Sequence, residues 1–230
     1  MKLYYDLHIH SALSPCGDMD MTPNNIVNMS IIKGLDIIAV SDHNSVGNVR
    51  SVMKVAENTE LVVVPGMEVE TSEEVHVLCL FPDIECAEKA AERVYAALGS
   101  VKNRPEIFGE QAFMDEEDEI CGTEEKLLVT ATSLSIDAVK KLADECGGVA
   151  IPAHLDRSSY SVLSNLGMLP DIGFNTVEVS KKTLPENFQY LNKKIIQNSD
   201  AHYLEDISEP ECTLDLPEKS AKALVDWLRQ

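Results

Sequence analysis

Short runs of apolar, β-branched residues alternate along the chain with segments of helical periodicity. The apolar runs are continuous rather than alternating with polar residues, which is typical of strands buried on both faces of a parallel sheet. The expected strands are 3–9, 36–40, 61–64, 75–81, 149–152, 176–179 and 194–197. The expected helices are 22–34, 46–57, 84–98, 136–146 and 216–228. This order predicts an α/β fold, either a barrel or a doubly wound sheet.

The alternation is interrupted between residues 101 and 130. This segment contains Pro105, Gly109 and Gly122, and seven acidic residues lie between positions 115 and 125. We expect it to be an acidic insertion or lid within a single domain that spans residues 1–230. A solvated acidic loop without a role is an equally good interpretation of the acids themselves.

Composition and charge narrow the class of protein. The chain has 230 residues, 44% hydrophobic and 25% charged, the balance of a globular protein that can bury a full core. Its 19 basic and 39 acidic residues give a formal net charge of −20. A field of this sign repels nucleic-acid backbones and anionic membranes, so we expect no bulk binding to either. A small phosphorylated substrate remains possible because a bound metal ion inverts the local field.

The N-terminal residues, the length of the apolar runs and the cysteines indicate in which cellular compartment the protein works. The first six residues contain no apolar core of a signal peptide, and no apolar run is long enough to span a bilayer. The six cysteines are scattered and form no C-x-x-C pair. We therefore expect reduced thiols and a cytoplasmic location, while the oligomeric state stays open.

The six histidines fall where strands are expected to begin or end. Five lie at or just beyond the C-terminal end of an expected strand, and one lies at the start of a strand. They are His8, His10, His43, His76, His154 and His202, accompanied by Asp6, Asp42, Glu68 and Asp200. In parallel α/β folds that edge gathers ligands, and imidazole and carboxylate are ligands of Zn, Mn and Fe(II). Each residue alone has an ordinary structural interpretation, but together they predict a site for several metal ions.

Five groups of residues form motifs spread over nearly the whole chain. They are Asp-Leu-His-Ile-His-Ser (6–11), Ser-Asp-His-Asn (41–44), Gly-Met-Glu-Val (66–69) with Val-His-Val-Leu (75–78), Ala-His-Leu-Asp-Arg (153–157) and Asn-Ser-Asp-Ala-His (198–202). The set resembles the PHP (polymerase and histidinol phosphatase) domain family of metal-dependent phosphoesterases. This resemblance implies a distorted seven-stranded (β/α)7 TIM-like barrel that holds two to three divalent metal ions.

The resemblance also implies nine metal ligands in three groups. The first metal would be held by His8, His10, Glu68 and Asp200; the second by Glu68, His76 and His154; the third by Asp18, His43 and His202. Asp18 is placed by counting back from Thr22-Pro23, with Asp20 as the alternative. Cys16 is expected to be a loop thiol, because a carboxylate suits a site of oxygen and nitrogen ligands better. Asp42 would either orient an imidazole or cap a turn.

Basic residues near the same edge are candidates for phosphate recognition. Arg157 follows His154 by three residues, and a guanidinium matches two phosphate oxygens at once. A surface salt bridge is the alternative role for this arginine. Lys181 and Lys182 follow the expected strand 176–179 and are further candidates for substrate binding. Arg104 would reach the site only if the insertion folds over it.

These roles imply a metal-dependent phosphoric ester hydrolase that acts through metal-activated hydroxide, with Glu68, Asp200, His202 and Arg157 as catalytic residues. Segment 147–157 is similar to the family branch that acts on nucleotide phosphates, although Leu155 replaces that branch's proline. A nucleotide-type phosphomonoester is therefore the favoured substrate. A histidinol-phosphate-type phosphatase and a non-catalytic, metal-binding regulatory module are the alternatives. A C–N bond hydrolase is disfavoured because no lysine ends a strand between positions 43 and 154, where it could bridge two metals.

Overall fold

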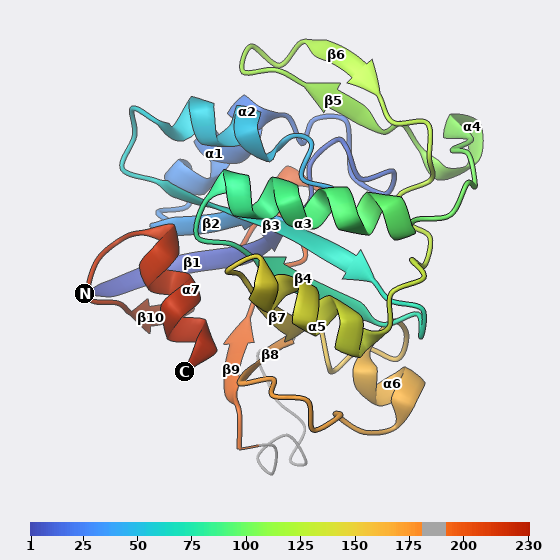
Figure 1. Ribbon diagram of the computed structural model, residues 1–230. Coiled ribbons are helices and arrows are strands. Elements are labelled where there is room, and N and C mark those ends of the chain that lie inside the picture. The colour runs from blue at the N-terminus through green and yellow to red at the C-terminus, as the bar shows by residue number, and fades with distance from the viewer. Residues whose placement is uncertain (181–191) are drawn as a thin grey trace.

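The computed structural model describes residues 1–180 and 192–230 and shows a curled sheet covered by helices (Figure 1). The six strands lie in the order β10-β1-β2-β3-β4-β7. Their bounds are β1 Lys2–Ile9, β2 Ile37–Val40, β3 Val62–Glu70, β4 His76–Leu80, β7 Val149–Pro152 and β10 Thr213–Asp215. A separate pair consists of β8 Thr176–Val179 and β9 Lys194–Gln197. The main helices are α1 Pro23–Ile32, α2 Val49–Ala56, α3 Ile84–Ala97, α5 Ile136–Glu145 and α7 Ala221–Arg229, with shorter helices α6 Val162–Leu166 and η2 Leu204–Asp206.

Both faces of the sheet are buried, which explains why its strands are continuously apolar. In β2, Ile38 and Val40 belong to the core formed with α1, α2, α3 and α5. The alternate residues Ile37 and Ala39 belong to a second core, which α7 covers. Since successive side chains of a strand point to opposite faces, a strand between two cores has no polar face.

Capping residues set the helix boundaries. Thr22 accepts a hydrogen bond from the Asn25 amide at 3.3 Å, and Gly34 has the left-handed backbone, at φ 75°, that ends α1. The last helix begins later than the expected residue 216, because Ser220 is its N-cap and accepts from the Ala223 amide at 3.1 Å. No helix within the two described ranges is long and apolar enough to cross a membrane.

The sheet is mixed, so the prediction of a wholly parallel sheet is wrong. Strands β1, β2 and β3 are parallel, whereas β4 is antiparallel to both β3 and β7. The reason is that β3 extends to Glu70 and a short turn leads directly to His76, a connection that only antiparallel strands allow. The reversed direction of β4 brings His76, at its start, to the same edge as the C-terminal ends of β1, β2 and β3.

A few isolated backbone hydrogen bonds link the β8-β9 pair to the main sheet. The Leu155 amide, after β7, donates to the Glu178 carbonyl at 2.9 Å, a bond that a proline at this position could not make. The His10 amide, after β1, donates to the Ala201 carbonyl at 2.9 Å. These contacts are not ladders, so the structure shows an open, curled six-stranded sheet and does not confirm a closed seven-stranded barrel.

The segment 101–130 packs against the N-terminal part of the fold. The side chain of Asn48 donates to the Ala112 carbonyl at 3.0 Å and accepts from the Met114 amide at 2.9 Å. Asn44, next to His43, donates to the Leu128 carbonyl at 2.7 Å. The elements of the segment are α4 Pro105–Phe108 and the hairpin of β5 Ala112–Met114 with β6 Ile120–Thr123.

Candidate metal centre

The six imidazoles meet at one edge of the sheet, and five of them have a nitrogen within 3.7 Å of a Glu68 carboxylate oxygen: His8, His10, His43, His76 and His154. Glu68 Oε1 lies 2.9 Å from His76 Nδ1 and 3.1 Å from His154 Nε2, and those two nitrogens are 3.3 Å apart. On the other side, Glu68 Oε2 lies 3.1 Å from His43 Nδ1. The side chain of Glu68 is only 1% exposed. A carboxylate at this position can bridge two groups of nitrogen ligands.

The second group contains the two histidines of β1. His8 Nε2 lies 3.4 Å from both Glu68 Oε1 and Asp200 Oδ1, and His10 Nε2 lies 3.0 Å from Asp200 Oδ1. One potential ligand atom from each of these four residues lies within 4.8 Å of the others. The structure thus brings together the four residues that were expected to share the first metal.

A third group consists of His10, His43 and His202. Beside it lies Cys16, whose Sγ is 3.1 Å from His202 Nε2. Desolvation raises the pKa of the Cys16 thiol, but hydrogen bonds and charge from His202 and His43 outweigh it and lower the pKa to about 6. Cys16 therefore lies within this group, which its expected role as an ordinary loop thiol did not anticipate.

Asp18 is not part of any of the three groups in the described residues. The loop turns before it: the Gly17 amide donates to the Ser14 carbonyl at 2.8 Å, and the Asp18 amide donates to the His202 carbonyl at 2.9 Å. The Asp18 carboxylate accepts from the Asp20 amide at 2.8 Å, within its own loop. The structure thus places the backbone of Asp18 beside the third group but turns a carboxylate oxygen into the loop, and it places Asp20 at the exposed surface.

Three histidines donate their Nδ1–H to acceptors around the cluster. The pairs are His8 with Glu178, His10 with Ser14 and His202 with the carbonyl of Asp200, each at 2.9 Å. These acceptors assign the proton to Nδ1 and leave the lone pair on Nε2. Metal-binding histidines have this arrangement, in which an outer acceptor fixes the tautomer and the direction of the ring.

Glu178, in β8, is a member of the site that the sequence analysis did not predict. It is 1% exposed and accepts from His8 Nδ1, from the His154 amide at 2.9 Å and from Asn198 Nδ2 at 2.6 Å. A signal was present in the sequence, because Glu178 is the one charged residue in the otherwise apolar strand 176–179. An acid in a strand with two buried faces indicates a buried partner.

Asp42 contacts the imidazoles only through a serine. It accepts from Ser11 Oγ at 2.6 Å and from Ser14 Oγ at 2.7 Å, and Ser14 in turn accepts from His10. Asp42 also accepts from the Ser11 amide at 2.7 Å. It therefore holds the loop after β1 and orients His10 indirectly, which combines the two roles considered for it.

The charges of the cluster shift several pKa values. Burial is the largest influence on Glu68 and would raise its pKa, but four nearby imidazoles together outweigh burial and lower this pKa well below its ordinary value; they are those of His76, His8, His154 and His43. Burial favours neutral His8, yet the carboxylates of Glu178, Asp200 and Glu68 together raise the pKa of His8 well above its ordinary value. For His10, burial is the largest cause and lowers the pKa. Adjacent imidazoles thus differ in how readily they give up a proton.

Unpaired nitrogen atoms test whether these residues fit a metal. Among the described residues, the buried atoms His8 Nε2 and His43 Nδ1 have no hydrogen-bond partner, and both face Glu68. Buried polar atoms without a partner are costly and uncommon. A divalent cation would use both lone pairs, and imidazole with carboxylate is a donor set for Zn, Mn and Fe(II). The residues present fit a metal centre.

Backbone strain occurs at the same edge. His154 has φ 29° and Asp200 has φ 55°, in the left-handed region that non-glycine residues seldom adopt. Hydrogen bonds hold both: the His154 amide donates to Glu178, and the Asp200 carbonyl accepts from His202. Strain maintained by surrounding contacts is common at functional sites.

A small cavity of about 180 Å³ opens onto the centre. Arg157 lines it and places Nη1 2.5 Å from Asp200 Oδ2, with its side chain 42% exposed. Tyr160, which the sequence did not single out, also lines the cavity and stacks on His76 with ring centroids 4.8 Å apart. Arg104 is not among the lining residues, and Lys181 and Lys182 lie outside the described residues.

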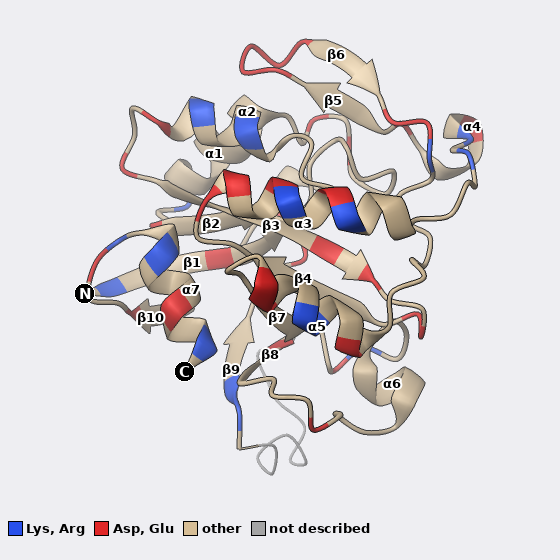
Figure 2. Ribbon diagram, in the orientation of Figure 1, with Lys and Arg blue, Asp and Glu red and all other residues tan. Residues whose placement is uncertain are grey.

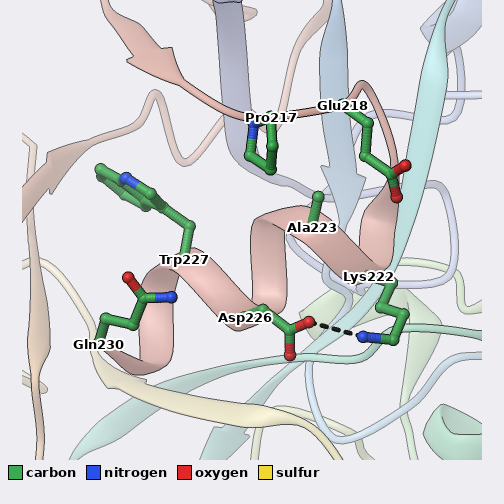
Figure 3. Close-up of a pocket in the computed structure, with 7 residues that line it drawn as sticks. All are labelled: Pro217, Glu218, Lys222, Ala223, Asp226, Trp227 and Gln230. Atoms are coloured by element: carbon green, nitrogen blue, oxygen red, sulfur yellow. Dashed lines mark hydrogen bonds and ion pairs between the residues drawn. The ribbon is translucent and has the colours of Figure 1, made fainter.

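A larger cavity of about 520 Å³ lies beside α7, and its lining includes none of the nine expected ligands (Figure 3). Lys222 and Asp226 form an ion pair across one turn of this helix at 2.7 Å. The larger cavity is therefore not the candidate active site, because the proposed chemistry needs ligand atoms that converge on one point.

Imidazoles and carboxylates converge beside a small cavity at the sheet edge of an α/β fold, which is the arrangement of a metal centre. The family model of the PHP domain matches residues 6–128, and the chain belongs to this family. The resemblance of the sequence motifs to that family is thereby confirmed. A search of curated proteins finds no match.

Solved structures share the fold at low identity. The lesion-specific endonuclease Q of Pyrococcus furiosus is 17% identical with a TM-score of 0.75; the match covers 100% of this chain and 56% of that chain. A protein of Bifidobacterium adolescentis, described as a candidate metal-dependent phosphoesterase, is 18% identical with a TM-score of 0.60 and coverages of 90% and 91%. An amidohydrolase of Chromobacterium violaceum is 18% identical with a TM-score of 0.58 and coverages of 98% and 95%. The chain thus spans just over half the length of the endonuclease Q chain.

Proposed function

We propose that the protein is a metal-dependent phosphoesterase that hydrolyses a small phosphorylated substrate, with a nucleotide-type phosphomonoester favoured. The observation that carries the proposal is the cluster of six imidazoles, five of them beside the carboxylate of Glu68, together with the guanidinium of Arg157 at the adjoining cavity. Imidazoles supply ligands for catalytic metals, and a guanidinium binds phosphate oxygens in pairs.

In this proposal two to three divalent ions, Zn, Mn or Fe, are held in the groups described above. The first would be held by His8, His10, Glu68 and Asp200, and the second by Glu68, His76 and His154. His43 and His202 would hold the third. Metal ions bound there would supply Lewis-acid charge and would lower the pKa of water.

The side chains of the protein would perform the remaining tasks. Arg157 would bind the phosphoryl oxygens, and its ion pair with Asp200 keeps the guanidinium at the centre. Glu178 would hold His8 in the tautomer whose Nε2 faces Glu68 and Asp200. Glu68, with a pKa well below its ordinary value, stays ionised through the neutral pH range and would keep its bridging charge.

The size of the cavity favours a substrate of which only a small group, such as a phosphoryl group, enters the centre. Ligand pockets for drug-sized molecules are typically about 300–1,000 Å³, and the cavity of about 180 Å³ at the centre is smaller. A phosphoryl group would enter it, and the rest of the substrate would lie outside, against Tyr160. The insertion 101–130 would act as a lid within a single domain 1–230. Its Leu128 carbonyl accepts a hydrogen bond from Asn44, the residue next to His43, which holds the insertion beside the centre.

Charge argues against a nucleic-acid substrate. One similar structure is that of endonuclease Q in complex with a 27-mer duplex substrate that has an abasic lesion at the active site. The present chain has a net charge of −20, and Figure 2 shows acidic residues along the loop that joins β5 to β6. Such a field opposes binding of a duplex phosphate backbone.

A substrate panel tests the proposal. Metal-loaded protein would be assayed with an aryl phosphate, nucleoside monophosphates, histidinol phosphate, a simple amide and duplex DNA with an abasic site. We expect phosphate release, with the highest kcat/KM for a nucleoside monophosphate. If the protein incises DNA or cleaves the amide but releases phosphate from none of the monoesters, the proposed phosphomonoesterase function is wrong.

Replacing Arg157 with Ala should lower kcat/KM for the phosphate substrate, mainly through a higher KM. A lost charged hydrogen bond costs about 1.5–3 kcal/mol, which corresponds to about 10- to 150-fold. Arg157→Lys should recover part of the loss, because it keeps the charge without the paired donors. Arg93→Ala is the matched control, since Arg93 pairs with exposed Glu145. Unchanged steady-state kinetics in Arg157→Ala would remove the arginine from substrate binding.

Replacing Glu178 with Gln should weaken metal binding about 10- to 100-fold, as is typical when the acceptor behind a ligating histidine is altered. The reason is that the glutamine lacks the charge that raises the pKa of His8 and fixes its tautomer. Competition with a chromophoric chelator would measure the affinity, with exposed Glu218→Gln as the control. Equal affinities for wild type and Glu178→Gln would contradict this role.

A further inference from the structure

The thiol of Cys16 faces the third imidazole group. Its Sγ lies 3.1 Å from His202 Nε2, and His202 donates its Nδ1–H to the Asp200 carbonyl. The lone pair of His202 is therefore on Nε2, directed at the sulfur. Either the thiol proton or a metal ion lies between two such atoms.

Contacts of the loop hold Cys16 in this position. The Asp18 amide donates to the carbonyl of His202, which ties the loop to the histidine that the thiol faces. Gly17 allows the turn, because a Cβ at this residue would lie 2.6 Å from the Ser11 carbonyl oxygen. The placement of the sulfur thus depends on specific packing.

A second imidazole of the same group contacts the thiol. His43 belongs to the third group, its side chain is 7% exposed, and Cys16 interacts with it as well as with His202. The carboxylate expected at this position, Asp18, accepts a hydrogen bond from the Asp20 amide instead. Beside the imidazoles of His43 and His202 there is therefore a thiol in place of the expected carboxylate.

We propose that Cys16 is a thiolate ligand of the third metal position, with His43 and His202, in place of Asp18. This assignment rests on the metal centre proposed above and deepens it. A thiolate is a soft ligand that favours zinc over manganese, whereas carboxylate and imidazole alone discriminate less. The consequence is a centre in which the third position prefers zinc.

Cobalt(II) and thiol alkylation test the assignment without an activity assay. Wild type, Cys16→Ser, Asp18→Asn and, as the matched control, exposed Cys121→Ser would be reconstituted with Co(II). We expect a thiolate-to-cobalt charge-transfer band in the near ultraviolet that is absent only in Cys16→Ser. Zinc at about ten times its dissociation constant should slow alkylation of Cys16 about tenfold, because only the free thiol reacts, and manganese should slow it less.

The outcomes separate this assignment from the proposed function. If elemental analysis shows bound metal but Cys16 is alkylated at the metal-free rate and no charge-transfer band forms, the thiol only donates a hydrogen bond and the assignment fails alone. Loss of the third ion in Asp18→Asn with retention in Cys16→Ser would likewise restore Asp18 as the ligand. If no variant, wild type included, binds any metal, the assignment and the proposed function fail together.

Discussion

Glu68→Gln protein should fold but lose its metal ions and at least about 10³-fold in turnover. Glu68 lies within 3.4 Å of four imidazoles, those of His8, His43, His76 and His154, so its charge serves more than one group of ligands. Metal-ion catalysis contributes several kcal/mol, and each 1.36 kcal/mol is tenfold in rate. Elemental analysis and steady-state kinetics on the same preparation would measure both losses.

The control for this variant is Glu145→Gln on α5. Glu145 is an exposed carboxylate that pairs with Arg93 at 2.8 Å, far from the imidazole edge, and its replacement should leave metal content and turnover unchanged. Circular dichroism would establish that both variants fold. If Glu68→Gln keeps its metal and its activity falls less than about tenfold, Glu68 does not bridge the centre.

Metal affinity should rise steeply with pH near neutrality. Burial lowers the pKa values of His8 and His43, but the neighbouring carboxylates, Glu178 first, at His8 and the hydrogen bond with Cys16, followed by Glu68, at His43 raise both pKa values well above the ordinary value. The metal-free protein therefore favours the protonated forms of these two imidazoles. A metal must displace those protons, and each proton released changes the affinity about tenfold per pH unit. Two protons predict an affinity about 100-fold weaker at pH 6 than at pH 7.

Titration calorimetry in two buffers with different ionisation enthalpies would count the protons released. The Glu178→Gln variant is an internal check, because removing the carboxylate that raises the pKa of His8 should make the pH dependence shallower. An affinity for zinc that is the same at pH 6 and pH 7 would mean that the histidines are neutral before binding, contrary to the expectation.

The sequence predicts the positions of elements better than their pairing. The strands expected at 149–152, 176–179 and 194–197 have those bounds in the structure, because each is an apolar run with turn residues on both sides. The direction of β4 was not predicted, since apolar runs look alike in parallel and antiparallel sheets. β10 and α6 were also not predicted, because each is only a few residues long.

For the candidate site too, the sequence predicts some residues well and others poorly. His8, His10, Glu68 and Asp200 come together as expected, because each lies at a sheet edge that the strand pattern defines. The choice between Asp18 and Cys16 depends on a turn held by the carbonyl of His202, which is far away in the sequence, so counting residues could not decide it. Contacts between distant segments are fixed by packing and are not visible in a local pattern.

The most direct test of the central claim is elemental analysis of protein purified without a tag or chelator, with phosphate release measured on the same sample. A centre of six imidazoles, five of them beside Glu68, predicts two to three divalent ions per chain, with phosphate release that is lost on chelation and restored by the metal. A protein that binds no metal even after reconstitution, or that releases phosphate equally well without it, would contradict the claim.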